Sequence, residues 1–249
     1  MSEKARHIAG IHSVRTVLKH GAEQVQGIWF DYRRNDRRLG QLLSEARKSG
    51  VRVFATDKIE LERLAPGVRH QGVVARTAMP AARGEDFLDR LLEELQEPPF
   101  LLVLDGVQDP HNLGACLRTA DAAGVHAVIA PRDRAVGLTP VACKVASGAA
   151  ETMPFIQVTN LARSLRQLRE ACGLWVVGLA GEAEQSIYQA NLKGPLVMVM
   201  GGEEKGIRRL VREQCDLLVS IPMAGVVESV NVSVATAASL FEAVRQRGI

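Results

Sequence analysis

The sequence of 249 residues contains few aromatic side chains and no long apolar run. Phe, Trp and Tyr together make up 4% of it, and no stretch reaches the roughly 20 apolar residues that a membrane-spanning helix needs. The first ten residues carry charges and no apolar core of the kind that directs export. We therefore expect a globular protein of the cytoplasm with no membrane segment.

Cysteine is scarce, and its spacing excludes the common cysteine-based sites. Cys116, Cys143, Cys172 and Cys215 form no Cys-x-x-Cys pair and match no zinc-site spacing. We expect them to be reduced and mostly buried, and we expect no metal site. The sequence also lacks Gly-x-Gly-x-x-Gly after any apolar run and lacks Gly-x-Ser-x-Gly, which argues against a nicotinamide dehydrogenase and an α/β-hydrolase.

Charge is distributed unevenly along the chain. Residues 1–80 carry 15 basic and 8 acidic side chains, residues 81–97 carry 2 and 6, and residues 98–249 carry 14 of each. The net charge of +7 in the first part favours a polyanionic partner, although a small basic domain without such a partner is an alternative. Within this part, segment 31–38 contains four arginines and Tyr32, which suit phosphate contacts and one stacked base; a solvated helix start is the other interpretation.

The pattern of apolar residues predicts two α/β domains. Residues 1–78 alternate short apolar runs with amphipathic segments, which is typical of a small α/β unit. Residues 79–98 are acidic and begin and end with prolines, so we expect a linker there. Residues 99–249 then form the second domain.

The second domain alternates apolar runs with helical patterns. The expected strands are Leu101–Leu104, Ala127–Ala130, Trp175–Leu179, Leu196–Met200 and Leu217–Ile221, and the expected helices are Asn112–Ala123, Leu161–Ala171, Gly206–Gln214 and Asn231–Gln246. Continuous apolar runs of this kind predict a parallel sheet with helices on both faces. Ligands of such sheets bind beyond the carboxyl ends of the strands. The loops after Leu104, Met200 and Ile221 are therefore the candidate site.

The first of these loops runs from Asp105 to Gly114 and leads into a helix that carries Arg118. Helical side chains tilt toward the amino end, so Arg118 is expected to lean over Gly114 toward the helix start and, with free backbone N–H groups, to form a phosphate seat. The alternative is purely structural. Asp109 and Asn112 would then cap the helix, and Arg118 would pair with a surface acid.

The second and third loops are also unusual in composition. Residues 200–206 read Met-Gly-Gly-Glu-Glu-Lys-Gly, in which adjacent glycines permit close backbone approach and the acids accept hydrogen bonds; a structural turn is the alternative. Residues 221–235 begin apolar, which suits a flat ring such as adenine, and become polar at Ser229 and Asn231. Helix capping explains one of these two residues, and core packing or a subunit interface would explain the small residues that follow.

Taken together, the three loops resemble the motifs of the SpoU (TrmH-type) branch of the SPOUT methyltransferases. The segment from Asp105 to Arg118 is similar to the first motif of that family. The segment Met200-Gly-Gly-Glu203 with Gly206 is similar to the second motif, and Ile221-Pro-Met223 with residues 229–233 is similar to the third. The resemblance extends over the chain from about Gly10 to Arg247.

The resemblance implies a fold and a function. It implies an α/β protein whose parallel-sheet domain contains a deep trefoil knot, a homodimer with active sites at the subunit interface, and an L30e-like RNA-binding domain over residues 1–78. It further implies S-adenosylmethionine-dependent 2′-O-methylation of a guanosine ribose in the peptidyl-transferase region of large-subunit ribosomal RNA. A transfer-RNA methyltransferase of the same family and a catalytically silent ribosome-assembly protein are the alternatives.

Residue roles follow from the motif positions. The resemblance implies that Gly201, Ile221 and Val230 contact the cofactor, and that Asn112, Arg118, Glu203, Ser229 and Asn231 form the catalytic and substrate-holding set. A guanidinium is a poor base because its pKa exceeds ~12. We therefore expect Arg118 to hold a phosphate, with the proton leaving to a phosphate oxygen, water or a neighbouring group. Glu203 is expected to orient Arg118 or to bind the ribose, and His111 to be structural.

Overall fold

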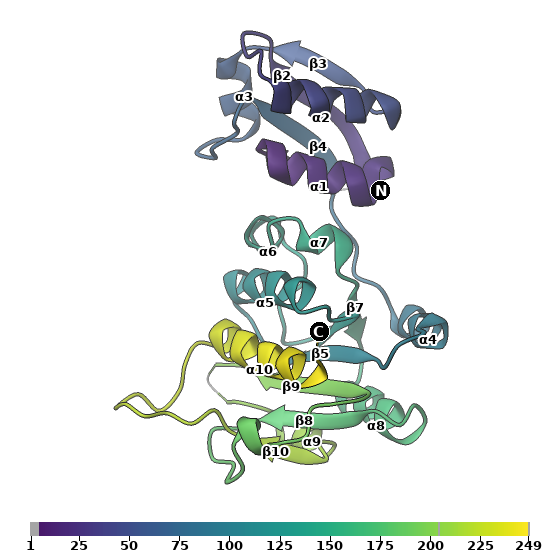
Figure 1. Cartoon of the computed structure of the whole chain (residues 1–249), viewed down its shortest axis with the longest axis vertical. Coiled ribbons are helices and arrows are strands. Elements are labelled where there is room, and N and C mark those ends of the chain that lie inside the picture. The colour runs from purple at the N-terminus through teal and green to yellow at the C-terminus, as the bar shows by residue number, and fades with distance from the viewer. Residues whose placement is uncertain (1–4, 204, 249) are drawn as a thin grey trace. The chain divides into compact units, whose positions relative to one another are not determined.

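The computed structural model describes residues 5–203 and 205–248. The chain divides into two compact units, Met1–Pro80 and Ala81–Ile249, and each unit has its own apolar core (Figure 1). No helix in these described ranges is long and apolar enough to cross a membrane.

The first unit is a four-stranded sheet covered by helices. Its elements are β1 (Ala5–Ala9), α1 (Ile11–Gly21), the 3₁₀ turn η1 (Ala22–Gln24), β2 (Val25–Asp31), α2 (Arg37–Lys48), β3 (Val53–Thr56), α3 (Lys58–Leu64) and β4 (Val73–Ala78). The strand order is β1-β4-β2-β3, in which β4 is antiparallel to both neighbours and β2 and β3 are parallel. Leu42 and Val14 contribute to the core between α1, α2 and the sheet, and Leu61 of α3 belongs to a separate buried cluster with Val74.

The second unit is built on a parallel sheet, as expected, which has six strands where five were predicted. Its elements are α4 (Glu85–Glu94), β5 (Phe100–Asp105), α5 (Pro110–Ala122), β6 (Ala127–Pro131), α6 (Pro140–Val145), α7 (Ala149–Thr152), β7 (Phe155–Val158), α8 (Leu161–Glu170), β8 (Trp175–Leu179), η2 (Ile187–Gln189), β9 (Leu196–Gly201), α9 (Arg209–Arg212), β10 (Leu217–Val219) and α10 (Val232–Arg247). The strand order is β10-β8-β9-β5-β6-β7.

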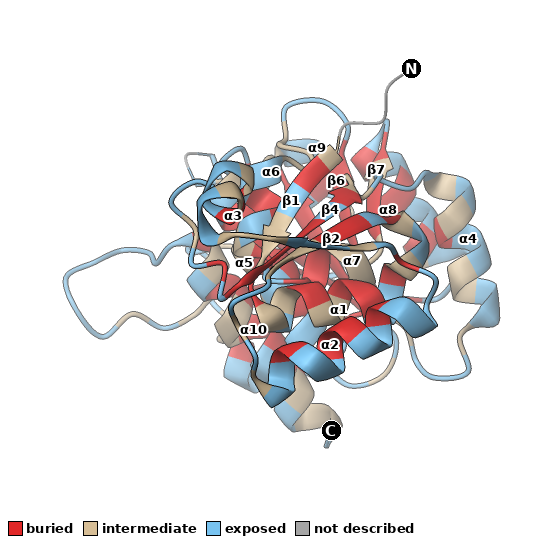
Figure 2. Ribbon diagram, turned by 90° about the horizontal axis from the view of Figure 1, so that it is seen from above, coloured by how far each residue is buried: buried red, intermediate tan, exposed pale blue. Residues whose placement is uncertain are grey.

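Helices cover this sheet on both faces, which explains the apolar character of its strands. Leu88 of α4, Leu165 of α8 and Val211 of α9 share one core cluster with alternate residues of the strands. Helix α10 packs against α5 and β9, and α5 also contacts α6 and α7. In Figure 2, β6 of this sheet is coloured as buried, whereas α4 is mostly exposed or intermediate.

Two expectations about these elements were wrong in detail, and three short elements were not predicted. The helix expected over Gly206–Gln214 is only the four-residue α9, because Gly206 has a left-handed φ of 59° and Asp105 holds Arg208 outside the helix. The last strand ends at Val219, so Ile221 lies beyond it. The short elements α6, α7 and β7 were not anticipated.

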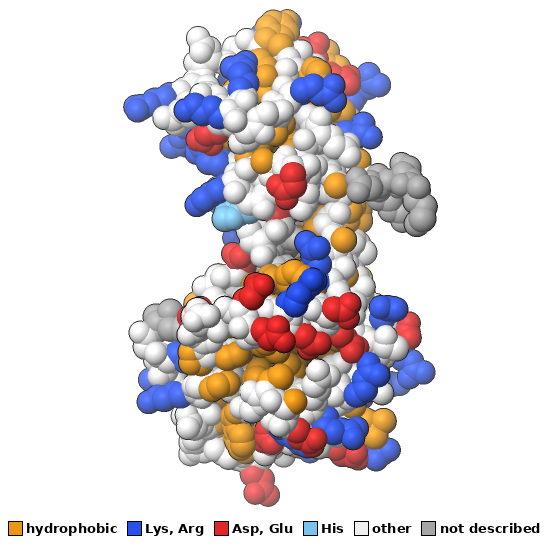
Figure 3. All heavy atoms as spheres, turned by 90° about the vertical axis from the view of Figure 1, so that its right-hand side faces the viewer, with side chains coloured by type: hydrophobic (Ala, Val, Ile, Leu, Met, Phe, Trp, Pro, Cys, Tyr) orange, Lys and Arg blue, Asp and Glu red, His pale blue; other side chains and the backbone are white. Residues whose placement is uncertain are grey.

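Much of the expected linker packs on the second unit. Helix α4 buries Leu88 in the core of that unit, and Arg83 exchanges two backbone hydrogen bonds with the edge strand β7, through Phe155 O and Gln157 N. The acidic side chains of α4 are half-buried or exposed. On the face shown in Figure 3, basic side chains predominate on the first unit and acidic side chains gather on the second.

The four cysteines are free, and their surroundings differ. Cys116 and Cys143 are buried, Cys215 is half-buried and Cys172 is exposed. Burial raises the pKa of Cys116 to about 11 and that of Cys215 to about 12. Since the thiolate is the reactive form, both thiols are unreactive near neutral pH.

The end of α10 is attached to the loop before β9 and to the start of β5. Gln246 accepts from Leu192 N at 3.0 Å and donates to Ala190 O at 3.1 Å, while Arg247 donates to Pro99 O and Gly194 O. Glu242, which is buried, accepts from Gln246 and twice from Arg245 at 2.8 Å. This network secures the C-terminal helix to the sheet.

The Glu242 network predicts a pH-dependent stability. Hydrogen bonds from Arg245, followed by that from Gln246, lower the pKa of Glu242 to about 2, whereas an unfolded glutamate titrates near ~4.3. A carboxylate with a lowered folded-state pKa stabilises the protein above the unfolded pKa and ceases to do so as the pH falls toward the folded pKa. We therefore expect wild type to exceed Glu242→Gln in unfolding free energy at pH 7, with the difference shrinking from about pH 4 to pH 2 in urea titrations. A pH-independent difference would contradict this account.

Candidate active site

The first two candidate loops meet because β5 and β9 are adjacent parallel strands. Asp105 at the end of β5 pairs in register with Gly201 at the end of β9, and Gly202 N donates to Asp105 O at 2.9 Å. A Cβ on Gly201 would lie closer than 3.0 Å to the backbone of Gly206 and Ile207, and one on Gly202 would lie that close to Gly106. These glycines therefore allow backbone segments to pack on each other, whereas the sequence had suggested close approach to a ligand.

Asp105 anchors the loop after β9 through an ion pair. Its side chain is fully buried and accepts from Arg208 N at 2.8 Å and from Arg208 Nε at 2.6 Å. The guanidinium of Arg208 is partly exposed and satisfies the charge that burial would otherwise leave unpaired. The pair closes the loop from Gly201 to Arg208 over the end of the sheet. Sequence reasoning gave Asp105 and Arg208 no role, because 103 residues separate them.

A chain of amide and carboxylate hydrogen bonds joins all three loops. Asn112, which is buried near the start of α5, donates through Nδ2 to Glu203 Oε1 of the second loop. Asn231 of the third loop donates through Nδ2 to Asn112 Oδ1 at 3.0 Å. Both asparagines can act as donor and acceptor, so the chain fixes their amide orientations. Three of the expected site residues are thus brought together.

Asn231 serves this network and the fold at once. Its Oδ1 accepts from Ser233 N at 2.8 Å and from Ser233 Oγ at 2.6 Å, which caps the first turn of α10. The Oδ1 atom of Asn231 therefore caps α10, and its Nδ2 atom donates to the network. Ser229, two residues earlier, is exposed. Its hydroxyl has no hydrogen-bond partner within the described ranges.

Arg118 is separate from the network. Asn112 and Arg118 are six residues apart on α5, which places them about 240° apart around the helix axis. Arg118 is exposed and has no ion pair or hydrogen bond to any residue that the structure describes. Glu203 accepts a hydrogen bond from Asn112. The expected contact between Glu203 and Arg118 is not found among the described residues. Gly114, which lies about one helical turn before Arg118, faces α6. A Cβ on Gly114 would lie closer than 3.0 Å to Ala142 O and Val145. The expected path for the guanidinium over Gly114 is therefore filled by another helix.

The first two loops enclose a cleft of about 360 Å³. Its lining comes from the segment after β5, the loop after β9 and Arg134 on the loop after β6; the full set is Asp105, Gly106, Gln108, Asp109, Arg134, Gly202, Glu203, Lys205, Gly206 and Arg208. Both acidic and basic side chains line it. Such a cleft can receive hydroxyl, amino and phosphate groups at once.

The residues expected to contact the cofactor lie on the second and third loops. Gly201 ends β9, Ile221 follows β10, and both are half-buried; Val230 is 38% exposed immediately before Asn231. None of the three lines the cleft described above. Val226 and Val227 of the third loop are also exposed, so this loop presents apolar surface without a cover from the described residues. Apolar side chains beside free backbone groups suit an adenine ring and its exocyclic amine.

In the first unit, part of the arginine cluster has a structural role. Arg34 donates to Gln71 O and to Asp36, and Asp36 caps α2. Arg33 lies over the Tyr32 ring at 5.4 Å, and both are exposed. Arg33 and Tyr32 are therefore accessible, as both interpretations of segment 31–38 require, while Arg34 shapes the local backbone.

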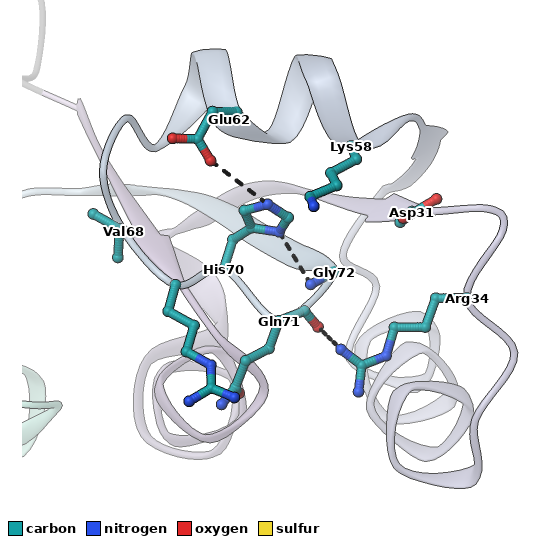
Figure 4. Close-up of a pocket in the computed structure, with 9 residues that line it drawn as sticks. Asp31, Arg34, Lys58, Glu62, Val68, His70, Gln71 and Gly72 are labelled. Atoms are coloured by element: carbon teal, nitrogen blue, oxygen red, sulfur yellow. Dashed lines mark hydrogen bonds and ion pairs between the residues drawn. The ribbon is translucent and has the colours of Figure 1, made fainter.

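Beside this cluster lies a cleft of about 390 Å³ (Figure 4). His70 is buried within it and accepts through Nδ1 from Gly72 N at 3.1 Å, with Glu62 3.9 Å from its Nε2. Lys58 and Arg69 also line the cleft, and neither has a hydrogen-bond or ion-pair partner in the described ranges. Two unpaired cationic side chains in the lining of a cleft suit the binding of a phosphate-bearing ligand.

No group of three or more His, Cys, Asp or Glu side chains in the described ranges could hold a metal ion.

Comparisons with known proteins agree with this organisation. Residues 99–241 match the model of the SpoU rRNA Methylase family, and residues 7–82 match a model described as RNA 2′-O ribose methyltransferase substrate binding. A protein of Ralstonia nicotianae named 23S rRNA (guanosine-2′-O-)-methyltransferase RlmB is 56% identical over 247 residues, covering 99% of this chain and 98% of that protein. A protein of the same name from Pseudomonas putida is 56% identical over 242 residues, covering 97% of each chain.

Solved structures resemble both units together. The SpoU methyltransferase AviRb from Streptomyces viridochromogenes, in complex with AdoMet, has a TM-score of 0.77 and 27% sequence identity, covering 96% of this chain and 89% of that one. A parallel α/β domain with this loop cluster, joined to a unit that matches a substrate-binding model, defines an RNA methyltransferase. The chain belongs to the SpoU rRNA methylase family. The resemblance inferred from the three loops is thereby confirmed.

Proposed function

We propose that this protein transfers a methyl group from S-adenosylmethionine to the 2′-hydroxyl of a guanosine in 23S ribosomal RNA, acting in the cytoplasm. The observation that carries the proposal is the hydrogen-bonded chain from Glu203 through Asn112 to Asn231, which assembles the three motifs at one edge of the sheet. The names of the full-length relatives supply the nucleotide and the RNA.

The residues of the second and third loops fit the cofactor. Half-buried Ile221 and exposed Val230 offer apolar surface to the adenine ring, and half-buried Gly201 is proposed to contact the cofactor through its backbone at the end of β9. When bound, S-adenosylmethionine supplies an activated methyl group. The residues of the chain then have to hold the ribose in line with that methyl and to accommodate the departing proton.

In this proposal, the site acts mainly by positioning. Glu203 and Asn112 hold the ribose hydroxyls, Ser229 and Asn231 orient the groups at the start of α10, and Arg118 binds the adjacent phosphate. Holding reactants in line can supply several kcal/mol of the barrier. Arg118 remains protonated throughout, because a guanidinium has a pKa above ~12. The proton passes to a phosphate oxygen, to water or to a neighbouring group.

We propose that the active enzyme is a homodimer with its sites at the subunit interface. Arg118 lies on a different face of α5 from Asn112, and a second copy of the chain could place its own arginine beside the network, which supports this proposal. Val234 and Phe241 of α10 are about half exposed, and the loop before this helix is also exposed. Together they supply apolar surface for the contact between subunits.

The knot implied by the sequence resemblance is part of the same proposal. The anchoring of α10 to β5 and the loop before β9 supports it, because the chain must return from the edge strand β10 to reach these contacts.

The dimer proposal can be tested by complementation between inactive variants. We expect Arg118→Ala and Asn112→Ala to be inactive alone and to regain part of the wild-type activity when co-expressed, since each mixed dimer contains one intact site. Separately purified and unmixed variants are the control. Failure of every mixture to recover activity, despite formation of mixed dimers, would place each site within one chain.

Residues 1–80 are proposed to bind the RNA. We expect a chain of residues 81–249 to remain folded and to bind S-adenosylmethionine by calorimetry, because its core is self-contained, while its kcat/KM on ribosomal RNA falls by about 100-fold or more. The assay uses labelled cofactor and RNA from a strain that lacks the modification, followed by mapping of the methylated nucleotide. Full activity of the shortened chain would exclude the RNA-binding role, and methylation of transfer RNA alone would favour the alternative substrate.

A further inference from the structure

A second cleft, of about 430 Å³, lies beside the active-site cleft at the same edge of the sheet. It is formed at the ends of β6 and β7, at the start of α8 and at α9. Arg134 and Arg208 line both clefts and therefore stand on the wall between them. The expected site residues include none from this second cleft.

Arg134 is the free cation of the shared wall. Arg208 is paired with Asp105, and Arg209, which also lines the second cleft, is paired with Glu213 at 2.6 Å. Arg134 has no hydrogen bond or ion pair within residues 5–203 and 205–248, although Asp133 lines the same cleft. Its backbone has a left-handed φ of 59°, an uncommon conformation for a residue other than glycine. A free guanidinium accessible from two clefts is suited to a phosphate diester that runs from one to the other.

The rest of the second cleft suits a nucleobase. Leu210 is 56% exposed on its lining and offers an apolar surface for a flat ring. Asn160 uses its Oδ1 to cap α8 by accepting from Arg163 N at 3.1 Å, so its Nδ2 is available to donate to a base carbonyl. The lining thus combines an apolar surface, an amide donor and a phosphate-binding cation.

We propose that the second cleft holds the nucleotide next to the methylated one, with Arg134 bound to the phosphate that links the two. This inference rests on the proposed function, because it assumes that the active-site cleft holds the target ribose. Arg134 is then a positioning residue that fixes the RNA backbone beside the target ribose.

The first experiment tests the phosphate contact in the full-length protein. We expect Arg134→Ala to lower kcat/KM on ribosomal RNA by about tenfold or more, to reduce the salt dependence of RNA binding by about one charge, and to leave S-adenosylmethionine binding unchanged. Arg132→Ala is the matched control, because Arg132 is exposed on the same loop and lines neither cleft. Equal effects of the two variants, or no effect of Arg134→Ala, would overturn the inference.

The second experiment tests the base. Short RNA substrates carry an abasic residue on either the 5′ or the 3′ side of the target. For wild type, we expect the abasic residue on one of the two sides to lower kcat/KM about tenfold relative to the intact RNA. For Leu210→Ala, we expect the same abasic residue to lower kcat/KM much less, because the base contact is already lost. Independent, multiplicative effects of the variant and the abasic residue would overturn the base contact. A wild-type protein that methylates none of the RNAs would instead overturn the proposed function, and this inference with it.

Discussion

Replacement of Arg118 by alanine is expected to lower the rate of methyl transfer by about 100- to 1000-fold while leaving S-adenosylmethionine binding nearly unchanged. The guanidinium is exposed and makes no hydrogen bond or ion pair with a described residue, so its removal costs little stability. Its proposed task is to hold the phosphate beside the target ribose, which matters for the reaction and not for the cofactor. Turnover on ribosomal RNA and calorimetry with the cofactor measure the two effects separately.

Two further variants test this assignment. Arg118→Lys keeps the charge but loses the planar fork that binds a phosphate through two hydrogen bonds, so an intermediate rate is expected. Arg166→Ala removes an arginine that is likewise exposed and unpaired within the described ranges, on α8 at the other face of the sheet, and should retain wild-type activity. An active Arg118→Ala enzyme would exclude the phosphate role.

Substitution of Gly201 by alanine is expected to abolish activity by displacing the loop after β9. The new Cβ would lie closer than 3.0 Å to backbone atoms of Gly206 and Ile207, and backbone cannot rotate away as a side chain can. The loop must move, and with it Glu203 and the cofactor contacts. A displacement of about 1 Å can cost about 100-fold in rate, and overpacking costs about 1–3 kcal/mol of stability.

Gly84→Ala is the matched control for this prediction, because nothing lies within 4 Å of the position its Cβ would occupy. Calorimetry, methyl transfer and thermal unfolding should all be close to wild type for it. For Gly201→Ala we expect weaker cofactor binding, activity at least 100-fold lower and a lower melting temperature. Normal cofactor affinity in the folded Gly201→Ala variant would show that the loop tolerates the displacement.

The sheet of the second unit was predictable because its central strands are buried on both faces. Runs such as Leu101–Leu104 and Leu196–Met200 show continuous apolar character, which few other elements have. The rule that ligands bind beyond the carboxyl ends of parallel strands then selected three loops that the structure joins by hydrogen bonds. Asn112, Glu203 and Asn231 were chosen by resemblance, and the structure joins them by hydrogen bonds.

What the sequence did not predict depends on contacts between distant segments. The Asp105–Arg208 pair shortens α9, and no local pattern announces it. From the sequence, Gly114 was expected to leave room for the Arg118 side chain, but the structure shows that Gly114 leaves room for α6. Which faces of two helices meet depends on the side chains of both helices, so one segment alone does not predict it. Short elements such as β7 contain too few residues to show a period.

The double use of Asn231 links catalysis to the completion of synthesis. The same amide caps α10, the last helix of the chain, and bonds Asn112 in the network. A nascent chain that still lacks residues 232–247 has no helix for Asn231 to cap, and the network has no fixed third member. The proposed active site would therefore form only on chains that include α10, and a chain truncated before this helix would be inert toward RNA even if its sheet had folded.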